Sequence, residues 1–439
     1  MTDNVAIPKS ASGGAAGERP TTGFGARGWT VIIFQAIMFW IAAGAVTHGL
    51  NVTLPALSET YHLDYNLLLA LATPASWVSI LGGPFSAWLS EKKGAKFNVI
   101  LCLVACGLCY GLLGYSSSVV IFTLLFSGVC FFGTGFAYVG GTAIVASWFV
   151  KKSGMAFGWT TMGQVFSSAF YVPALALSYS VFGVANGFWS IASMMFVMAI
   201  LVTLFIYNHP EDCGLYPDNE APTAEELAQK AEQEAQSKTE PQLSVKRLLG
   251  MKDVWLMGIA TGAIYIMLVG VVSQIVPRLI QSGYELNEAI FYMSASALFG
   301  VTGAYGWGWL NQKIGVKPAI MVYTLWWIVA IGFNIFADNT IALAISMLMI
   351  GFSLPGATNL STALIASKFP RKQYIRAIGI IHPVQSIVRC FAFSILAFGL
   401  AYLGGYNGAY LMFMAIGVIT LLLFWLTDIT PVNDADLNN

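Results

Sequence analysis

The chain has 439 residues, of which 57% are hydrophobic and 10% are charged, and its mean hydropathy is +0.71. Soluble domains carry about 25% charged residues, so this composition excludes a soluble enzyme, a nucleic-acid-binding protein and a disordered chain. Lys plus Arg and Asp plus Glu number 21 each, so the net charge indicates no particular partner.

The first 27 residues are rich in Gly, Ala, Ser and Thr, and they lack the basic and then apolar layout of a cleavable signal. We expect residues 1–27 to form a disordered cytoplasmic tail. A second short polar tail, residues 428–439, follows the last apolar stretch, and we expect it to be cytoplasmic as well.

Between the two tails, the chain consists of twelve apolar stretches separated by polar breaks. A helix needs about 20 apolar residues to cross the hydrocarbon core, and long runs without alternation favour helices over a β-barrel. The sequence therefore predicts an all-α integral membrane protein with twelve transmembrane helices. The stretches cover approximately residues 28–52, 66–90, 97–115, 119–149, 154–181, 186–207, 253–277, 288–311, 317–337, 340–367, 374–403 and 406–427.

A polar segment, residues 208–252, separates the first six stretches from the last six. Its charged, helix-prone composition is typical of a cytoplasmic linker with a solvated surface. We therefore expect an N-terminal six-helix lobe at residues 28–207 and a C-terminal six-helix lobe at residues 253–427.

Lys and Arg concentrate on one side of the predicted membrane. If the N-terminus is inside, 19 of the 21 basic residues fall on the cytoplasmic side, and only Arg278 and Arg389 fall elsewhere. Cytoplasmic loops carry an excess of Lys and Arg. The sequence thus predicts a multi-pass protein of the plasma (inner) membrane with both termini in the cytoplasm.

The two halves share an internal repeat. Residues 87–96 (AWLSEKKGAK) follow the second stretch, and residues 308–317 (GWLNQKIGVK) follow the eighth, at an offset of 221 residues. Leu54-Pro55 and Val276-Pro277 keep nearly the same offset. Two six-helix repeats in parallel arrangement are typical of a two-lobed transporter.

The loop at 87–96 is similar to the helix 2–3 signature of the major facilitator superfamily, G-x-L-A-D-R-x-G-R-R, with Ala87, Glu91 and Lys92 in place of Gly, Asp and Arg. The resemblance covers about residues 28–427 and implies two pseudo-symmetric lobes and a cytoplasmic latch between them. Since Gln312 replaces the acid in the second copy, only the first copy can form an ionic latch. The implied latch residues are Glu91, Lys92, Gly94 and Lys96 in the first copy, and Lys313, Gly315 and Lys317 in the second.

Three further segments, 133–138 (GTGFAY), 148–158 (WFVKKSGMAFG) and 210–218 (PEDCGLYPD), resemble signatures of monocarboxylate transporters and oxalate/formate antiporters. Their glycines also permit close helix packing. The antiporters resemble one another in an Arg on helix 8 and a Lys on helix 11, where this chain has Ala304 and Gln385. Because two cations suit a dianion, their replacement favours a larger monoanion over oxalate.

Asp253 and Glu288 lie at the very start of their predicted spans, and no Asp or Glu lies deeper within a span, whereas Arg389 lies near the middle of the eleventh. At about 1.5 Å per residue, it is about 20 Å from Arg376 and cannot easily reach the cytoplasmic interface. A central Arg costs about 2.5–3.5 kcal/mol on insertion scales, and ionisable groups inside membranes are usually functional. Because guanidinium binds carboxylate through two hydrogen bonds, we expect Arg389 to bind a small organic anion. The alternative is that Arg389 bonds only to carbonyls or water.

His382 and Gln385 share a helix face with Arg389, so we expect them to line the same cavity. Gln164 on helix 5 is the repeat counterpart of Gln385 at the offset of 221, and we expect the two amides to face each other across the pseudo-two-fold axis.

His48 on helix 1 is a candidate ligand or proton carrier, because an ordinary His titrates near physiological pH. The alternative is a His capped by a neighbouring helix. Tyr138 on helix 4 and Asn359 on helix 10 are further candidates for substrate binding.

Together these features predict a secondary transporter of an organic monocarboxylate that works by alternating access, as a proton symporter or an anion exchanger. Its partners are the substrate anion, a proton or counter-anion and the lipid bilayer, with no nucleic acid, and the family resemblance implies a monomer. The sequence contains no catalytic motif, Walker motif or metal-ligand spacing, so we expect no enzymatic activity, metal or cofactor. Two alternatives stay open: an exporter of neutral or aromatic small molecules, in which Arg389 is structural, and a non-transporting membrane receptor.

Overall fold

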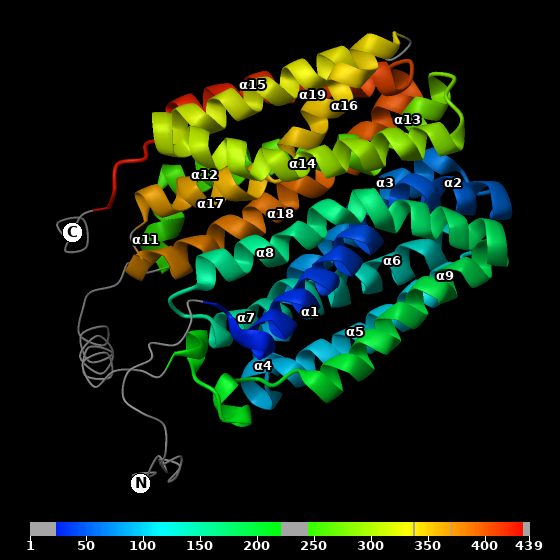
Figure 1. The fold of residues 1–439 in the computed structure, drawn as a ribbon. Coiled ribbons are helices and arrows are strands. Elements are labelled where there is room, and N and C mark those ends of the chain that lie inside the picture. Colours follow the sequence, from blue (N-terminus) through cyan, green and yellow to red (C-terminus); the bar gives the residue numbers. More distant parts are fainter. Residues whose placement is uncertain (1–22, 221–244, 337–338, 370, 433–439) are drawn as a thin grey trace, which may run out of the picture.

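The computed structural model describes residues 23–220, 245–336, 339–369 and 371–432. In these ranges the regular secondary structure is helical. Figure 1 shows two bundles of long helices side by side. Residues 1–22 of the predicted disordered tail lie outside the described residues, as do residues 221–244 of the linker and residues 433–439 of the C-terminal tail. The predicted end of the disordered tail at residue 27 is wrong, because α1 already begins at Gly25.

The N-terminal bundle contains the first six predicted spans, three of which are interrupted by a π-helical turn. A π-turn adds one residue to a helical turn and locally shifts the direction of the side chains. Its elements are α1 (Gly25–Ala43), η1 (Gly44–His48), α2 (Leu50–Tyr61), α3 (Tyr65–Trp77), α4 (Ser79–Lys93), α5 (Ala95–Leu113), α6 (Val119–Gly133), η2 (Thr134–Gly140), α7 (Gly141–Trp148), α8 (Ser153–Phe166), η3 (Ser167–Tyr171) and α9 (Val172–Phe205), followed by the 3₁₀ turns η4 (Pro210–Cys213) and η5 (Pro217–Asn219).

The C-terminal bundle contains the last six predicted spans, two of which are broken into a pair of helices. The breaks fall at Gln274 and at Leu354-Pro355. The elements are α11 (Val245–Gly250), α12 (Lys252–Ser273), α13 (Ile275–Gln281), α14 (Leu286–Ile314), α15 (Val316–Ile335), α16 (Thr340–Ser353), α17 (Gly356–Lys368), α18 (Arg371–Tyr402) and α19 (Tyr406–Leu426).

The twelve predicted stretches fall on these helices, with ends that differ by several residues. By length and composition, nine helices of the described ranges are able to cross a membrane, or ten if the bent pair α16–α17 is one span. The count of membrane-crossing helices is below twelve because Ser153–Phe205 is counted as one 53-residue unit, although it holds two predicted stretches. The chain turns between these two stretches at Gly183, where φ is 75°. Small and polar residues also lower the hydropathy of α14.

Both bundles have one end near the described ends of the chain. We call the end at which α1 begins and α19 ends the terminal end, and the opposite end the distal end. In Figure 1 the terminal end is on the left, where α11 and the end of α4 also lie.

Two glycines turn the chain at the same point of both repeats. Gly94 has a φ of 89° between α4 and α5, and Gly315 has a φ of 85° between α14 and α15. Two residues later, Lys96 Nζ donates a hydrogen bond to a carbonyl in the last turn of α9 (2.8 Å), and Lys317 Nζ donates to the carbonyl of Thr427 after α19 (2.8 Å). Because helix C-termini carry partial negative charge, each lysine stabilises the last helix of its own bundle.

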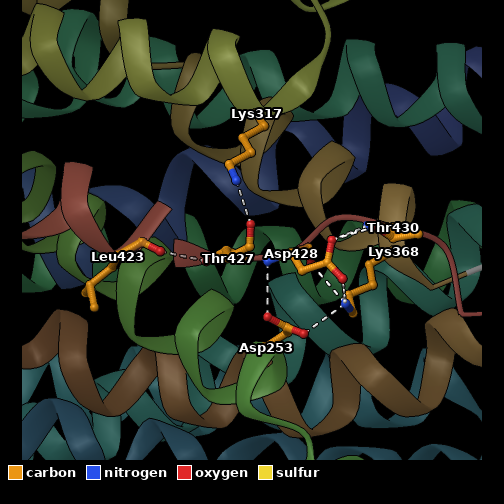
Figure 2. Close-up of polar contacts among 7 residues, drawn as sticks. All are labelled: Asp253, Lys317, Lys368, Leu423, Thr427, Asp428 and Thr430. Atoms are coloured by element: carbon orange, nitrogen blue, oxygen red, sulfur yellow. Dashed lines mark hydrogen bonds and ion pairs between the residues drawn. The ribbon is translucent and has the colours of Figure 1, made fainter. Parts of the chain in front are cut away.

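Residues 427–432, which we call the C-terminal strap, cross the terminal end of the C-terminal bundle. Lys368 is 4% exposed and forms ion pairs with Asp253 (2.9 Å) and Asp428 (3.3 Å), as Figure 2 shows. The amide of Asp428 donates to Asp253 Oδ1 (3.1 Å), and the amide of Val432 donates to the carbonyl of Lys368 (2.9 Å). The strap therefore joins the start of α12 to the end of α17.

An acidic residue holds the corresponding loop of the N-terminal bundle. The Asp218 carboxylate accepts hydrogen bonds from the amides of Val150 (3.1 Å), Lys151 (2.8 Å) and Lys152 (2.9 Å). Lys152 Nζ also pairs with Glu220 at 2.9 Å. Each bundle is thus braced across its terminal end by the segment that follows its last helix.

Lys368→Met is expected to destabilise the protein by about 3–5 kcal/mol, because it leaves the buried Asp253 carboxylate without its partner. Thermal unfolding in detergent measures the effect. The double variant Asp253→Asn with Lys368→Met removes both charges, so it should recover part of the loss. If the single variant were as stable as the wild type, the ion pair would contribute nothing.

The pKa of Asp428 lies below its ordinary value, because the hydroxyl and amide of Thr430 donate hydrogen bonds to its carboxylate and Lys368 adds a positive charge. A carboxylate with a lowered pKa stabilises the folded state fully above its unfolded pKa of about 3.9, and this contribution disappears as the pH falls through the folded pKa. Asp428→Asn should therefore lower the Tm at pH 7, and the difference from wild type should shrink progressively below about pH 4. Thermal scans between pH 7 and pH 3 test this, and a difference that does not change with pH would contradict it.

Candidate functional site

Arg389 lies near the middle of the 32-residue helix α18, and its side chain is half-buried. Helix α18 packs against α12 of its own bundle and against α3 of the other bundle. Figure 1 shows α18 between the two bundles. The residue is therefore placed at the line of contact between the two lobes, which we call the seam.

The charge of Arg389 interacts with thiol and phenol groups from both lobes. Cys390 is its neighbour on α18, Tyr265 comes from α12, and Tyr138 and Cys130 come from the N-terminal bundle. None of these groups is a carboxylic acid. In the part of the chain that the structure describes, no Asp or Glu forms an ion pair with Arg389. The described residues therefore leave the guanidinium without its preferred partner.

Tyr138 is 42% exposed, although it lies in the middle of the fourth span. Its ring packs on Phe39, with 5.2 Å between the ring centroids. Tyr138 interacts electrostatically with Arg389 across the seam. An exposed phenol of one lobe close to a half-buried guanidinium of the other indicates that this part of the seam is accessible to a small solute.

Tyr265 belongs to the same group and did not stand out in the sequence. Its hydroxyl oxygen lies 3.0 Å from Thr358 Oγ1 on α17. Asn359, a predicted site residue, follows Thr358 and is exposed. The only available signal was a tyrosine inside an apolar stretch, and because the chain has 18 tyrosines, that signal does not identify one of them.

His382 is exposed and interacts electrostatically with Arg389. Gln385 lies between them on α18 and is 9% exposed, where the helix packs closely on Gly262 of α12. The structure thus brings His382 and Arg389 together on one helix. Gln164 is half-buried on α8, and its pairing with Gln385 stays a prediction.

His48 lies inside the N-terminal bundle and is 7% exposed. Its Nδ1 atom is 2.5 Å from Ser168 Oγ. This hydrogen bond connects η1 to η3, which is the capping alternative that the sequence left open. The role of His48 as a ligand or proton carrier stays a prediction.

The candidates of the N-terminal bundle lie on or beside the π-helical turns. His48 is in η1, Tyr138 is in η2, and Gln164 lies on α8 shortly before η3. Such turns are frequent at functional sites because they redirect side chains and loosen the backbone ladder. Tight packing accompanies the first turn, since a Cβ on Gly44 would lie 2.3 Å from the ring of Tyr171.

Asn51 joins the two lobes in the distal half of the seam. Its side-chain amide donates to the carbonyl of Val272 (2.7 Å), and its Oδ1 accepts the amide of Val276 (2.9 Å). These backbone groups flank Gln274, where α12 ends and α13 begins. Helix ends leave such groups without partners inside the helix, so Asn51 caps a break in a helix of the other lobe.

The other cross-lobe hydrogen bonds lie in the same half. Tyr65 of α3 donates to the side-chain oxygen of Gln274, which also accepts a hydrogen bond from Tyr406 within the C-terminal bundle. Thr73 and Trp77 of α3 bond to α18. Among the described residues, the cross-lobe hydrogen bonds lie between the level of Ile387, two residues before Arg389 on α18, and the distal end. The lobes are therefore held together over their distal half.

The residues of the predicted latch contact their own lobes in this conformation. Lys96 and Lys317 bond to the last helix of each bundle, while Lys92 and Lys313 each lie over the ring of the tryptophan four residues earlier, at 4.7 and 4.8 Å. Glu91 is exposed and, within the described ranges, forms no ion pair. The latch between the lobes stays a prediction for a conformation in which the terminal end is closed.

Two repeated six-helix lobes with accessible polar side chains at mid-span define a membrane transporter of the two-lobed class. The family model described as Major Facilitator Superfamily matches residues 29–315 and 287–438. The chain therefore belongs to the Major Facilitator Superfamily, and the predicted fold class is confirmed. It is a transporter and not an enzyme.

A curated relative and several solved structures are similar to this chain, and the solved structures share its fold. A protein of Cupriavidus pinatubonensis (strain JMP 134 / LMG 1197), named "Probable 4-methylmuconolactone transporter", is 24% identical over 358 residues, which are 78% of this chain and 74% of the relative. A bacterial homolog to the human lysosomal transporter Spinster, inward-facing and occupied, has a TM-score of 0.68 and 14% identity over 91% of this chain and 96% of its own. The xylose transporter XylE of E. coli, inward open, has a TM-score of 0.68 and 16% identity over the same shares.

Asn51→Leu is expected to shift the protein toward opening at the distal end. It leaves the Val272 carbonyl and the Val276 amide unpaired in the closed arrangement, at a cost of about 1–3 kcal/mol for each buried group. Spin labels at the exposed positions Thr60 and Asn287, in a background without native cysteines, report the distance between the lobes at this end.

The matched control is Thr53→Val, which removes a buried hydroxyl that contacts Tyr179 inside the N-terminal bundle. The distance distribution should lengthen or broaden in Asn51→Leu and stay as in the wild type in the control. An identical distribution in all three proteins would exclude Asn51 as a tie between the lobes.

Proposed function

We propose that this protein is a secondary active transporter that moves an organic monocarboxylate across the membrane by alternating access, with Arg389 as the anchor of the carboxylate. The observation that supports this is a half-buried guanidinium at mid-span, at the seam of the lobes, whose described partners are phenols and thiols. A charged group at this depth costs about 2.5–3.5 kcal/mol on insertion scales. A substrate carboxylate offsets this cost because it binds guanidinium bidentately.

A single organic anion with an apolar body fits the composition of the site. One guanidinium neutralises one carboxylate, and Ala304 and Gln385 stand where oxalate/formate antiporters carry two cations. Aromatic rings lie beside the anchor, since Tyr138 packs on Phe39 and Trp77 on Phe391. The relative named for transport of 4-methylmuconolactone supports a small organic substrate.

The remaining site residues supply polar contacts and the coupling of transport. We assign His382, Gln385, Gln164, Tyr138 and Asn359 to the substrate cavity, and His48 to the cavity or to proton transfer. Because no Asp or Glu lies in the interior of a predicted span, a proton that travels with the anion is carried by His48 or His382, or by the substrate. Exchange of one anion for another requires no such carrier.

The basic residues support a location in the plasma (inner) membrane with both termini in the cytoplasm. In that orientation 19 of the 21 Lys and Arg residues are cytoplasmic, as expected from the excess of positive charge in inner loops. The terminal end is then the cytoplasmic end, and the distal end, where the lobes are joined, faces outward. We propose that the protein works as a monomer, because one chain contributes both lobes.

The competing proposal is an exporter of neutral or aromatic molecules in which Arg389 is structural. The rings near the seam are compatible with it. The two proposals differ in whether the substrate needs its charge, so the methyl ester of an acid that binds is the discriminating compound.

A thermal-shift screen of the protein in detergent against mono- and dicarboxylates, 4-methylmuconolactone and neutral aromatics tests the proposal. A ligand at 100 times its Kd stabilises the folded protein by about 2.7 kcal/mol. A monocarboxylate should raise the Tm of the wild type and leave that of Arg389→Ala unchanged, because the variant lacks the anchor.

Arg27→Ala is the matched control, since Arg27 is an exposed arginine at the terminal end, and it should respond like the wild type. Uptake of the same acid into proteoliposomes then separates transport from a receptor that only binds. The anchor role is refuted if neutral aromatics stabilise both proteins and no acid stabilises either.

A further inference from the structure

A hydroxyl group of the N-terminal lobe forms hydrogen bonds to the backbone of α18 next to Arg389. Thr73 Oγ1 donates a hydrogen bond to the carbonyl of Cys390 (3.0 Å) and accepts one from the amide of Ser394 (3.0 Å) and one from its hydroxyl (2.8 Å). Thr73 is 2% exposed. A hydroxyl has one donor and two acceptor positions, so all of them are used on α18.

The two backbone groups of α18 that Thr73 bonds are hydrogen-bond partners of each other in a regular α-helix. The carbonyl of Cys390 and the amide of Ser394 are four residues apart, so they form one rung of the α-helical ladder. A side chain that bonds both groups of one rung fixes this turn of α18 relative to α3. Thr73 therefore determines the backbone position of α18 in the turn that begins directly after Arg389.

Trp77 makes the corresponding contact on the other side of Arg389. Its Nε1 donates to the carbonyl of Ile387 (3.1 Å), and its ring packs on Phe391 at 5.3 Å and an interplanar angle of 77°. Thr73 and Trp77 are one helical turn apart on α3, so they share one face of that helix. Their contacts with α18 bracket Arg389.

The opposite side of α18 is fixed by its own lobe. A Cβ on Gly262 of α12 would lie 2.6 Å from Val388 Cβ, and a Cβ on Gly258 would lie 2.8 Å from a methyl group of Val384. The two helices are therefore in close backbone contact along this stretch. Arg389 is held between α12, which stays with it in one lobe, and α3, which belongs to the other.

We propose that Thr73 and Trp77 are positioning residues that orient Arg389 for the substrate carboxylate by holding the backbone of α18 on both sides of it. This inference rests on the proposed function of Arg389. Because the two residues come from the opposite lobe, the orientation depends on contact between α3 and α18. Separation of the lobes at the distal end breaks these hydrogen bonds, so the affinity for the anion is lower in that conformation than in the one observed.

Thr73→Val tests the inference, because valine keeps the shape of threonine and removes its hydrogen bonds. The Kd of a bound monocarboxylate should rise about fivefold, which is the factor that corresponds to the roughly 1 kcal/mol contributed by one hydrogen bond. Trp77→Phe, which keeps a ring and removes the donor, should raise it severalfold. Thr73→Ser restores the hydroxyl and should bind like the wild type.

Two further measurements distinguish positioning from a general loss of stability. Thr420→Val removes a buried threonine hydroxyl that bonds only within α19, and it should lower the Tm without changing the Kd. In an Arg389→Lys background, Thr73→Val should change the Kd less than twofold. Thr73 acts on the anion only through Arg389, so the effects of the two substitutions on the Kd are not additive.

The outcomes separate this inference from the function on which it rests. If the wild type binds a monocarboxylate through Arg389 and Thr73→Val binds it equally well, the positioning role is wrong and the proposed function stands. The positioning role is also wrong if Thr73→Val raises the Kd by the same factor in the Arg389→Lys background as in the wild type. If no acid binds the wild type, both proposals fail together.

Discussion

A positive charge at the middle of a membrane-spanning helix is the constraint on which the rest of this structure depends. In a medium of low dielectric constant such a charge needs a partner, and the described residues around Arg389 offer phenols and thiols. A soluble protein would hydrate the guanidinium at little cost. Here it has to stay within reach of an accessible seam, and this accounts for the exposed Tyr138 and His382 close to it. In the proposed function, the substrate anion completes this site.

The contacts of the lobes are divided between their two ends in a way that suits rigid-body motion. At the terminal end, each bundle is braced within itself, by Lys368 with Asp253 and Asp428 in one and by Asp218 in the other. At the distal end, hydrogen bonds cross from one bundle to the other, as Asn51 does to the break between α12 and α13. Bonds inside a lobe survive a rocking motion, whereas bonds across the seam must break and reform. In the proposed mechanism of alternating access, the hydrogen bonds across the seam therefore contribute to the energetic difference between the conformations.

The internal repeat explains why the two bundles share their bracing. The glycines at 94 and 315 have nearly the same backbone conformation, and the lysines two residues later bond to the ends of the last helices. The copies diverge where function requires it. Gln312 takes the place of Glu91, and the π-helical turns η1, η2 and η3 occur in the N-terminal bundle, whereas the C-terminal bundle has two plain breaks. In the proposed function, the C-terminal bundle carries the charge that binds the substrate, and the N-terminal bundle contributes polar side chains on or beside its π-helical turns.

The amino-acid sequence by itself determined the helical class, the division into six and six helices, and the position of Arg389 at mid-span. Each follows from quantities that are local in the chain: the length of an apolar run, the recurrence of a loop, and a charge among apolar neighbours. Only the tertiary structure decided that Tyr265 joins the site, that Asn51 caps a helix of the other lobe, and that the hydroxyl of Thr73 bonds to the backbone of α18. Threonine, asparagine and tyrosine are common in membrane helices, and helical periodicity gives the face on which a residue lies but not the helix that it meets. These contacts join residues more than 100 positions apart, so they are set by how the two lobes pack and not by any neighbouring sequence.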